Sequence, residues 1–343
     1  MPASVPVALD AYGADGGPEL VLEGARLAAA GGIPVRVFGP GGLDAPDGVE
    51  LEATTDWIGN EAEPVRAVRS TPDASIVRAA TAVAEGSCSS LVSAGSTGAT
   101  MTAALFALKR AQGVHRPALA VQIPVPGAEG PPLVFLDCGA NTDVRPAHLI
   151  QFAFLGAAFS SAVLGADNPR VALLSVGEEQ KKGRNDVVAA HEALADSQGI
   201  RFIGNVEGRD LLTGEADVIV TDGFTGNVTL KTLEGTSRAV ADAVRGAARS
   251  GPLAAAGGLL LRPALGGLRR SMDPNSVGGA ILLGLRGVAV VAHGSSTPEG
   301  IANAVRLANR AVAERAVERT AELLAASGAT RDALREEEAG DPR

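Results

Sequence analysis

The chain has 343 residues, of which 46% are hydrophobic and only 3% aromatic, and its formal net charge at pH 7 is −9. This length allows a sizeable core of Ala, Val, Leu and Ile, whereas the acidic balance and the few aromatic side chains argue against a nucleic-acid surface. Two cysteines without metal-type spacing and an N-terminus without a signal-peptide pattern predict a cytoplasmic protein without disulfides.

Short apolar runs alternate with stretches of helical spacing along most of the chain. The apolar runs predict strands at residues 5–9, 35–38, 91–92, 118–125, 133–136, 171–176, 201–203, 218–220 and 288–292. Helical periodicity predicts helices at residues 19–30, 72–85, 98–108, 146–164, 186–195, 226–249 and 298–324. This alternation predicts an α/β fold of three α/β/α layers with a mostly parallel sheet, in a single domain over residues 1–330.

Three segments and the tail depart from the alternation. Residues 44–60 are rich in turn residues and give no clear element, and residues 127–132 resemble a hairpin turn between two strands. Residues 250–273 are interrupted by Gly and Pro, which predicts an inserted helical hairpin broken near Pro263. The acidic tail, residues 331–343, is expected to be disordered.

Four short loops between a predicted strand and a stretch of helical character carry the most information about function. They are rich in Gly, Ser, Thr and Asn and span residues 93–98, 137–141, 222–227 and 293–296. A strand that ends in such residues and leads into a helix leaves backbone N–H groups free at its carboxyl end, where α/β sheets bind anions. We therefore expect the four loops to form one cleft that holds a phosphate or a developing oxyanion.

The first two loops offer polar groups but also have purely structural interpretations. Ser96, Thr97 and Gly98 are either phosphate ligands or a tight turn that caps the following helix, and they match neither a Walker loop nor a GxGxxG fingerprint. In the second loop, either Asn141 donates its amide to substrate while Asp137 orients a neighbour, or Asp137 caps an Asx-type turn. Cys138 is not expected to be a nucleophile, because no His lies near it in the sequence.

Two further candidates stand out by residue type and position. Lys182, at the end of a predicted strand, is one of only four lysines and can neutralise a phosphate as a point charge. Asn227 closes the third loop and is either an ordinary helix N-terminal residue or an amide donor to an acyl oxygen. In the fourth loop, His293, Ser295 and Ser296 are candidate substrate ligands, although a lone His is more often structural. The sequence shows no cluster of His, Asp and Glu that predicts a metal site.

Within residues 250–273, arginines surround a series of leucines. An ordinary packed hairpin with solvated arginines explains this pattern, and so does a partner surface for a membrane interface or an acidic carrier. The candidate partner residues are Arg262, Leu265, Arg269 and Arg270. The longest apolar stretches, residues 152–164 and 253–261, are too short or too interrupted to span a bilayer.

Taken in order, these motifs resemble those of the PlsX-type phosphate acyltransferases of bacterial phospholipid synthesis. The resemblance covers roughly residues 7–325 and rests on Asp10-Ala11 with Gly13 and Asp15, residues 93–99, residues 137–141, Gly177-Glu178-Glu179 with Lys182-Gly183, residues 203–210, residues 222–227 with Leu230-Lys231, and residues 292–296. Each motif alone is weak, but the ordered set is specific. The positions that depart from the family pattern are Tyr12, Ala14, Cys138, Gln180, Arg184, Val277 and Ile281.

The resemblance implies a fold like those of phosphotransacetylases and isopropylmalate dehydrogenases. It implies reversible transfer of a fatty acyl group from acyl carrier protein to inorganic phosphate, which gives acyl phosphate for phospholipid synthesis. It further implies a homodimer in peripheral contact with the membrane, a downstream acyltransferase that uses the product, and no intrinsic metal or organic cofactor. The catalytic Lys and Asn of that family correspond to Lys182 and Asn227.

Three other functions stay open on the sequence. A phosphotransacetylase-like enzyme would carry out the same chemistry on acyl-coenzyme A thioesters. An NAD-dependent decarboxylating dehydrogenase of related fold is disfavoured, because the sequence has no Asp cluster for a metal. A non-catalytic scaffold would bring carrier protein to membranes and form no product from phosphate.

Overall fold

The computed structural model describes residues 5–128, 130–271 and 274–334, and for residues 262–271 and 274 it describes the main chain alone. Its strands are β1 (Val7–Asp10), β2 (Val35–Gly39), β3 (Val49–Ala53), β4 (Ser90–Ser93), β5 (Ala118–Ile123), β6 (Leu133–Leu136), β7 (Arg170–Leu174), β8 (Arg201–Val206), β9 (Val218–Val220), β10 (Ala280–Leu283) and β11 (Val288–Val291). Its α-helices are α1 (Gly17–Ala30), α2 (Pro64–Ser70), α3 (Ser75–Ala84), α4 (Thr97–Leu108), α5 (Pro146–Ala162), α6 (Asn185–Ala195), α7 (Gly223–Ala248), α8 (Pro252–Ser271), α9 (Pro298–Ala313) and α10 (Ala316–Ala326).

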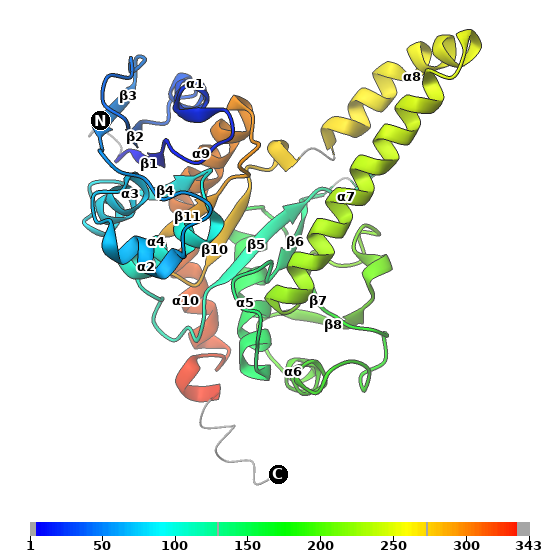
Figure 1. The fold of residues 1–343 in the computed structure, drawn as a ribbon. Helices are drawn as coiled ribbons and strands as arrows, with labels where there is room; N and C mark the ends of the chain where they lie inside the picture. Colours follow the sequence, from blue (N-terminus) through cyan, green and yellow to red (C-terminus); the bar gives the residue numbers. More distant parts are fainter. Residues whose placement is uncertain (1–4, 129, 272–273, 335–343) are drawn as a thin grey trace.

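The strands form one eleven-stranded sheet in the order β3-β2-β1-β4-β11-β10-β5-β6-β9-β7-β8 (Figure 1). Strands β3, β2, β1, β4 and β11 form one parallel half, and β6, β9, β7 and β8 form another. Between the halves, β10 and β5 pair in antiparallel fashion with both of their neighbours. The predicted mostly parallel sheet is confirmed, and so is the predicted hairpin, since β5 and β6 are antiparallel.

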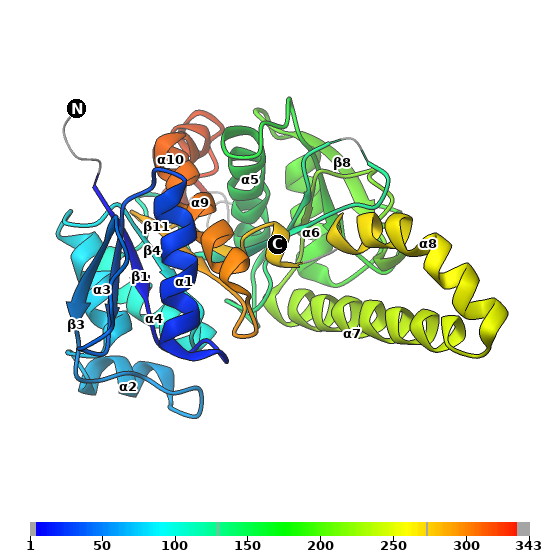
Figure 2. The ribbon, with the colours of Figure 1, turned by 90° about the horizontal axis from the view of Figure 1, so that it is seen from above.

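Helices cover both faces of the sheet, as the three-layer prediction requires (Figure 2). Neighbouring strand residues point to opposite faces, so that Val7 and Leu9 join one buried cluster and Ala8 another. The first face packs against α1, α5, α6, α9 and α10. The second face packs against α2, α3 and α4 over the β1 half. Over the β6 half it packs against the start of α7, through Leu230 and Leu233.

Helix α5, which the sequence predicted over residues 146–164, lies in the core. Its apolar residues lie on all sides, and nearly all of its 17 residues are buried. A helix that is apolar all round belongs inside a large core. It begins at Pro146, whose fixed φ suits the first helical turn and whose missing N–H is not needed there.

Helices α7 and α8 form a helical hairpin that projects from the body of the molecule (Figure 1). Helix α8 runs unbroken through Pro263, so the predicted break there is wrong, and the other limb is the distal part of α7 rather than part of residues 250–273. The chain turns over residues 249–251, where Gly251 precedes Pro252 at the start of α8. Proline is well suited to a first helical turn, which explains why the turn falls there.

Several elements differ from the prediction. Strand β3, helix α2 and strand β10 were not predicted, and the single helix predicted at 298–324 is divided into α9 and α10. The division lies at Arg315, whose φ of +53 interrupts the helix without any Gly or Pro to signal it. Residues 331–334, assigned to the tail by composition, form a helical turn whose Leu334 is buried. The rest of the predicted tail, residues 335–343, lies outside the described residues.

Within the described chain, none of the helices combines the length and apolarity that crossing a bilayer requires.

Candidate active site

The carboxylate of Asp137, which is fully buried, organises the loop after β6. One of its oxygens accepts hydrogen bonds from the main-chain N–H groups of Leu119 and Ala140, each at 3.0 Å. The other accepts from the N–H of Asn141 at 2.7 Å and from its side-chain amide at 2.8 Å. Burial raises the pKa of Asp137, although all four hydrogen bonds act in the opposite direction.

Asn141 serves this loop rather than a ligand. Its amide nitrogen donates to Asp137 and also to the carbonyl of Pro117, each at 2.8 Å, which uses both amide hydrogens. The expected role of Asn141 as a donor to substrate is therefore corrected, and Asp137 holds the local turn. Cys138 beside them is buried, and burial raises the pKa of its thiol well above the usual value, as expected for an unreactive cysteine.

The first turn of α7 packs directly against the Asp137 loop. The N–H of Gly223 donates to the carbonyl of Asn141 at 2.7 Å. A Cβ atom at Gly226 would lie 1.9 Å from the carbonyl oxygen of Asp137, so only glycine fits at that position. The next residue, Asn227, is exposed and lies beside Gly139, where a Cβ atom would be 3.9 Å from the Asn227 Cβ and Cγ atoms. This close approach fixes Asn227 next to the Asp137 loop.

Asp222 starts α7 as its N-cap. Its Oδ1 accepts the N–H of Thr225 at 2.9 Å, and its Oδ2 accepts the Thr225 hydroxyl at 2.7 Å. An N-cap carboxylate accepts hydrogen bonds from free N–H groups of the first turn, and its negative charge interacts favourably with the helix dipole. The same Oδ2 forms an ion pair with Nη1 of Arg184 at 3.1 Å.

Lys182 lies in the loop between β7 and α6 and is exposed. Its N–H donates to the carbonyl of Glu179 at 2.9 Å, and its own carbonyl accepts the Ser175 hydroxyl at 2.9 Å. Strands β7 and β9 are parallel neighbours, so the Lys182 loop and the start of α7 leave the sheet at the same edge. The Arg184–Asp222 ion pair then joins these two segments directly.

A second group of loops follows β1, β4 and β11. The N–H of Asp15 donates to the carbonyl of Gly294 at 2.8 Å, which joins the first and last of these loops. Gly13, with φ +95, approaches Gly95 so closely that a Cβ atom would lie 2.2 Å from the Gly95 Cα. Both the positive φ and the contact require glycine at position 13.

The predicted phosphate ligands Ser96, Thr97 and Gly98 form the start of α4. The Ser96 hydroxyl accepts the N–H of Ala99 at 3.4 Å, so the helix-cap interpretation of Ser96 is confirmed. Thr97 is exposed, and Gly98 lies against Pro64 of α2. Of the three, Thr97 presents its side chain to solvent.

In the loop after β11, His293 and Ser295 are exposed, whereas Ser296 is buried. Nδ1 of His293 accepts the N–H of Ser295 at 3.2 Å and lies 2.8 Å from its hydroxyl oxygen. The N–H of Ser296 donates to the carbonyl of His293 at 2.9 Å, which closes the turn. His293 and Ser295 are therefore oriented by each other, and Ser296 supports them from inside.

Beneath this second group lies Asp10, a buried carboxylate at the end of β1. Its two oxygens accept hydrogen bonds from the hydroxyls of Ser75 at 2.6 Å and Ser93 at 2.8 Å. The Ser93 oxygen in turn accepts the N–H of Gly95 at 3.0 Å. Burial raises the pKa of Asp10 to about 6, against the lowering effect of its hydrogen bonds. Asp10 thus fixes the Gly95 loop from within the core.

The two groups of loops leave the sheet at opposite edges. The strand direction reverses between β11 and β6, so the carboxyl ends of β4 and β11 lie opposite those of β6, β9 and β7. The four loops therefore do not share one carboxyl edge, and the expected single cleft stays a prediction. Ala140 of the Asp137 loop nevertheless packs against the buried cluster that includes Ala99 and Ala103 of α4, so both groups border the second face of the sheet.

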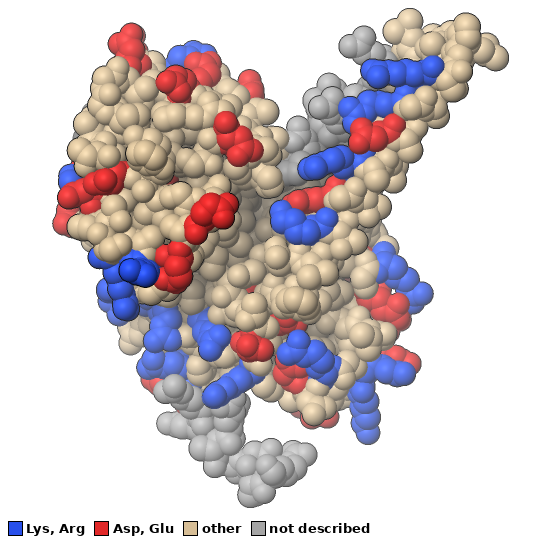
Figure 3. Space-filling model, in the orientation of Figure 1, with Lys and Arg blue, Asp and Glu red and all other residues tan. Residues whose placement is uncertain are grey.

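The surface is hollowed between the lobe that carries α2, α3 and α4 and the arm that begins with α7 (Figure 3). Acidic side chains lie on the lobe's side of this hollow, and both basic and acidic side chains follow the arm. The first turn of α7, with Asn227, stands at the base of that arm.

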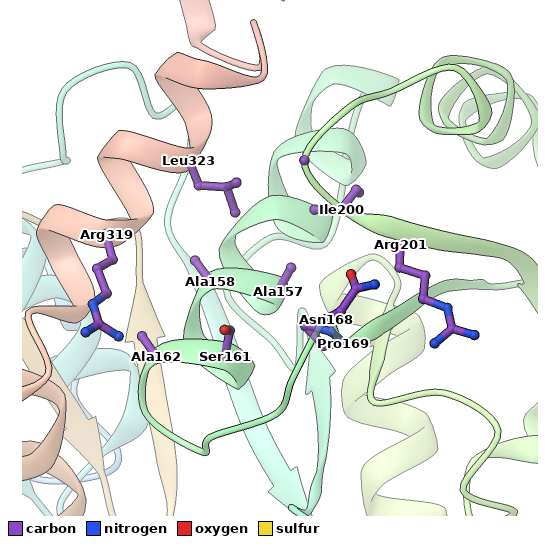
Figure 4. Close-up of a pocket in the computed structure, with 11 residues that line it drawn as sticks. Ala157, Ala158, Ser161, Ala162, Asn168, Pro169, Ile200, Arg201, Arg319 and Leu323 are labelled. Atoms are coloured by element: carbon purple, nitrogen blue, oxygen red, sulfur yellow. The ribbon is translucent and has the colours of Figure 1, made fainter.

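A separate cavity of about 250 Å³ lies away from all of the predicted site residues (Figure 4). It lies between α5, α10 and the start of β8, and its apolar lining includes Ala157, Ala158 and Leu323. Arg201 and Arg319 lie on opposite sides of the cavity and do not point toward one another. The two arginines therefore do not form a joint anion site.

The described residues contain no group of three or more His, Cys, Asp or Glu side chains that is placed to hold a metal ion. The candidate partner residues Arg262, Leu265, Arg269 and Arg270 lie in the second half of α8, and their side chains are outside the described part of the chain.

Sequence reasoning missed Arg184 and Asp222 as a link between loops. A signal existed for Asp222, because an Asp in front of a helix is a typical N-cap. Arg184 follows Lys182 by two residues, but nothing in the sequence indicated that it pairs with Asp222, which lies 38 residues further along the chain. Asp10 was part of a recognised motif, but nothing in the sequence indicated its hydrogen bonds to two serines.

Comparison with known proteins agrees with this architecture. A family model described as fatty acid synthesis protein matches residues 5–319. The phosphate acyltransferase of Geobacillus sp. (strain WCH70) is 44% identical over 314 residues, which cover 90% of this chain and 94% of that protein. The phosphate acyltransferase of Anaeromyxobacter dehalogenans (strain 2CP-C) is 42% identical over 336 residues, covering 94% and 91% of the two chains.

Solved structures show the same fold at low sequence identity. The EutD phosphotransacetylase from Staphylococcus aureus aligns with a TM-score of 0.57 at 20% identity, covering 90% of this chain and 95% of that one. A branched-chain phosphotransacylase from Enterococcus faecalis V583 aligns with a TM-score of 0.59 at 17% identity, covering 89% and 99%. These likenesses confirm the predicted phosphotransacetylase-like fold, and the family match with the sequence identities shows that the chain belongs to the phosphate acyltransferase family of fatty acid synthesis proteins.

Proposed function

We propose that the protein transfers a fatty acyl group from acyl carrier protein to inorganic phosphate and so supplies acyl phosphate for phospholipid synthesis. The observation that supports this most is the Arg184–Asp222 ion pair, which joins the loop of an exposed lysine to the helix start that carries an exposed amide. A cation and an amide donor on adjoining segments suit a reaction in which phosphate attacks a thioester. The family membership supports the same chemistry.

In the proposed reaction, the ammonium group of Lys182 holds the phosphate as a point charge. A phosphate oxygen attacks the thioester carbon, and a tetrahedral oxyanion forms. Asn227 donates its amide to this oxyanion. The intermediate then collapses: the C–S bond breaks, the new bond between the acyl carbon and the phosphate oxygen stays, and the thiolate of the carrier leaves and takes up a proton from solvent.

The reaction does not need a strong general acid, because a thiolate is a good leaving group. Positioning and electrostatic stabilisation are then the main sources of rate acceleration. The buried carboxylates Asp137 and Asp10 fit this view, because both are engaged in structural hydrogen bonds and neither is proposed as a general acid. Thr97, His293 and Ser295, exposed in the second group of loops, are proposed to contact the acyl-carrier side of the substrate.

The arm of α7 and α8 is proposed to make the peripheral membrane contact. Leu253, Leu259, Leu260 and Leu261 on α8 are each more than half exposed. An exposed leucine surface of this kind suits the apolar boundary of a bilayer interface. Arg262, Leu265, Arg269 and Arg270 follow on the same helix and are proposed to bind either the membrane or acyl carrier protein. A homodimer and a downstream acyltransferase that takes up the labile product complete the proposal.

Matched thioesters of one fatty acid, carried by acyl carrier protein or by coenzyme A, test the substrate assignment. Each is incubated with the protein over a range of phosphate concentrations, and free thiol and acyl phosphate are measured. We expect phosphate-dependent product from the carrier-protein thioester at a higher kcat/KM. Faster turnover of the coenzyme A thioester would favour the phosphotransacetylase alternative, and carrier binding without product would favour the scaffold.

A further inference from the structure

A bulge in β8 determines where the side chain of Asn205 lies. Strand β8 pairs with β7 at Val171–Phe202, but the next pair is Leu173–Asn205, so β8 contains one extra residue. Gly204 lies in this bulge with φ +96, a conformation that glycine adopts without strain. Because side chains alternate between faces, the extra residue moves Asn205 to the face that α6 covers.

On that face, the side chain of Asn205 makes two hydrogen bonds while the residue is only 6% exposed. Its Nδ2 donates to the carbonyl of Glu179 at 3.1 Å, and its Oδ1 lies 2.9 Å from Nδ1 of His191 in α6. The same Glu179 carbonyl accepts the N–H of Lys182 at 2.9 Å. One oxygen atom therefore joins Asn205 to the turn that presents Lys182.

These contacts also determine the proton position on His191. A carbonyl only accepts hydrogen bonds, so Asn205 directs its NH₂ group to Glu179 and its oxygen to His191. Nδ1 of His191 must then carry a hydrogen, whether the ring is neutral or protonated. Phe202 packs edge-on against the imidazole, with 5.1 Å between ring centroids, and helps to hold the ring in this orientation.

We propose that Asn205 is a positioning residue, supported by His191, that holds the Lys182 loop in the conformation in which the ammonium group meets phosphate. This inference rests on the proposed function, because it requires Lys182 to bind phosphate. It assigns a role to residues 203–210, a motif that no step of the proposed reaction uses.

The same motif supplies a matched control. Arg209 also contacts the Lys182 loop, through an ion pair with Glu178 at 3.3 Å, but both side chains are about two-thirds exposed. Exposed ion pairs contribute little to the stability of the structure around them, because water and salt screen their charges. Replacing Arg209 removes a contact to the same loop without removing a buried hydrogen bond.

The test measures KM for phosphate and kcat at saturating phosphate, with acyl carrier protein thioester as substrate. For Asn205→Ala and the isosteric Asn205→Asp we expect KM for phosphate to rise about five- to tenfold, the scale of one lost buried hydrogen bond. We expect kcat at saturating phosphate to change less than twofold, and Arg209→Gln to resemble the wild type. His191→Gln, which keeps a donor for Asn205, should be closer to the wild type than His191→Ala.

A double mutant shows whether Asn205 acts through Lys182. In the Lys182→Ala background, Asn205→Ala should have no further effect on KM for phosphate, and thermal unfolding confirms that each variant is folded at the assay temperature. Additive effects would overturn the inference, as would an unchanged KM in Asn205→Ala when Lys182→Ala raises it. An unchanged KM in Lys182→Ala itself would instead overturn the role of Lys182 in the proposed function, and the inference with it.

Discussion

Arg184 and Asp222, 38 residues apart in the chain, form a 3.1 Å ion pair between the Lys182 loop and the N-cap of α7. Asp222 is almost fully buried, whereas about half of the Arg184 side chain is exposed. Asp222 also accepts two hydrogen bonds from Thr225 that do not involve Arg184, so we expect the ion pair to matter more for the relative position of the two loops than for the helix itself.

We therefore predict that Arg184→Ala lowers kcat/KM about tenfold, because a small misplacement of reacting groups is costly, while the free energy of unfolding falls by less than about 1 kcal/mol. Steady-state kinetics and urea unfolding measure the two effects. Arg78→Ala is the control, since Arg78 forms an exposed ion pair with Glu52 far along the sheet. Equal kinetics in the two variants would contradict the linking role.

Replacing Asn227 should remove the proposed donor to the oxyanion. We expect Asn227→Ala to lower kcat by about 10²–10³, the usual effect of losing one oxyanion donor. Stability should change by less than about 0.5 kcal/mol, because the side chain is exposed. Val228→Ala, the next exposed residue of α7, should keep normal turnover. Wild-type-like kcat in Asn227→Ala would refute the assignment.

Lys182→Ala should weaken the response to phosphate. A hydrogen bond to a charged group contributes about 1.5–3 kcal/mol, so we expect KM for phosphate to rise about ten- to a hundredfold. Lys181→Ala, a change in the neighbouring exposed lysine, is the matched control and should leave KM unchanged. If both variants had the same phosphate dependence as the wild type, Lys182 would not be the phosphate ligand.

Asp10 gives a prediction for pH dependence. Burial raises its pKa from the ordinary 3.8 to about 6, so the folded protein favours the protonated carboxyl. The corresponding stability is fully present below about pH 4 and is lost as the pH rises through about 6. Relative to Asp10→Asn, the free energy of unfolding of the wild type should fall by about 3 kcal/mol over this range. Urea unfolding of both proteins from pH 4 to 7 measures the difference, and a constant difference would contradict it.

The exposed leucines of α8 predict membrane association. Leu260→Ser should reduce co-sedimentation with phospholipid vesicles, because the side chain is 82% exposed and offers apolar area to the interface. Val312→Ser, an exposed change on α9 away from the arm, should sediment like the wild type. Turnover of a soluble carrier-protein thioester should be normal in both. Equal vesicle binding by all three proteins would place the contact elsewhere.

The sequence predicted those elements whose stability depends on local pattern. Helix α5 was predicted, and its apolar residues on every side are typical of a buried helix. The edge strand β3 was missed because Val49–Ala53 contains two glutamates and is only partly buried. The break at Arg315 could not be predicted, because arginine is not a residue type that favours the left-handed conformation it adopts there.

The arrangement of the loops was predicted less well than their identity. The hairpin between β5 and β6 was predicted, and it implied that the strand direction reverses there, but the expectation of one cleft did not take this reversal into account. Hydrogen bonds between residues far apart in sequence, such as Asn205 to Glu179 or Ser75 to Asp10, decide which polar side chains are structural. A single sequence does not show which distant residues form these hydrogen bonds.

The stoichiometry of the reaction products tests the central claim most directly. The protein is incubated with a carrier-protein thioester, with and without phosphate, and acyl phosphate is trapped with hydroxylamine while free thiol is counted. We predict one acyl phosphate for each thiol released, and no thiol release above background when phosphate is left out. Thiol release that does not need phosphate, or that yields free fatty acid in place of acyl phosphate, would contradict the account.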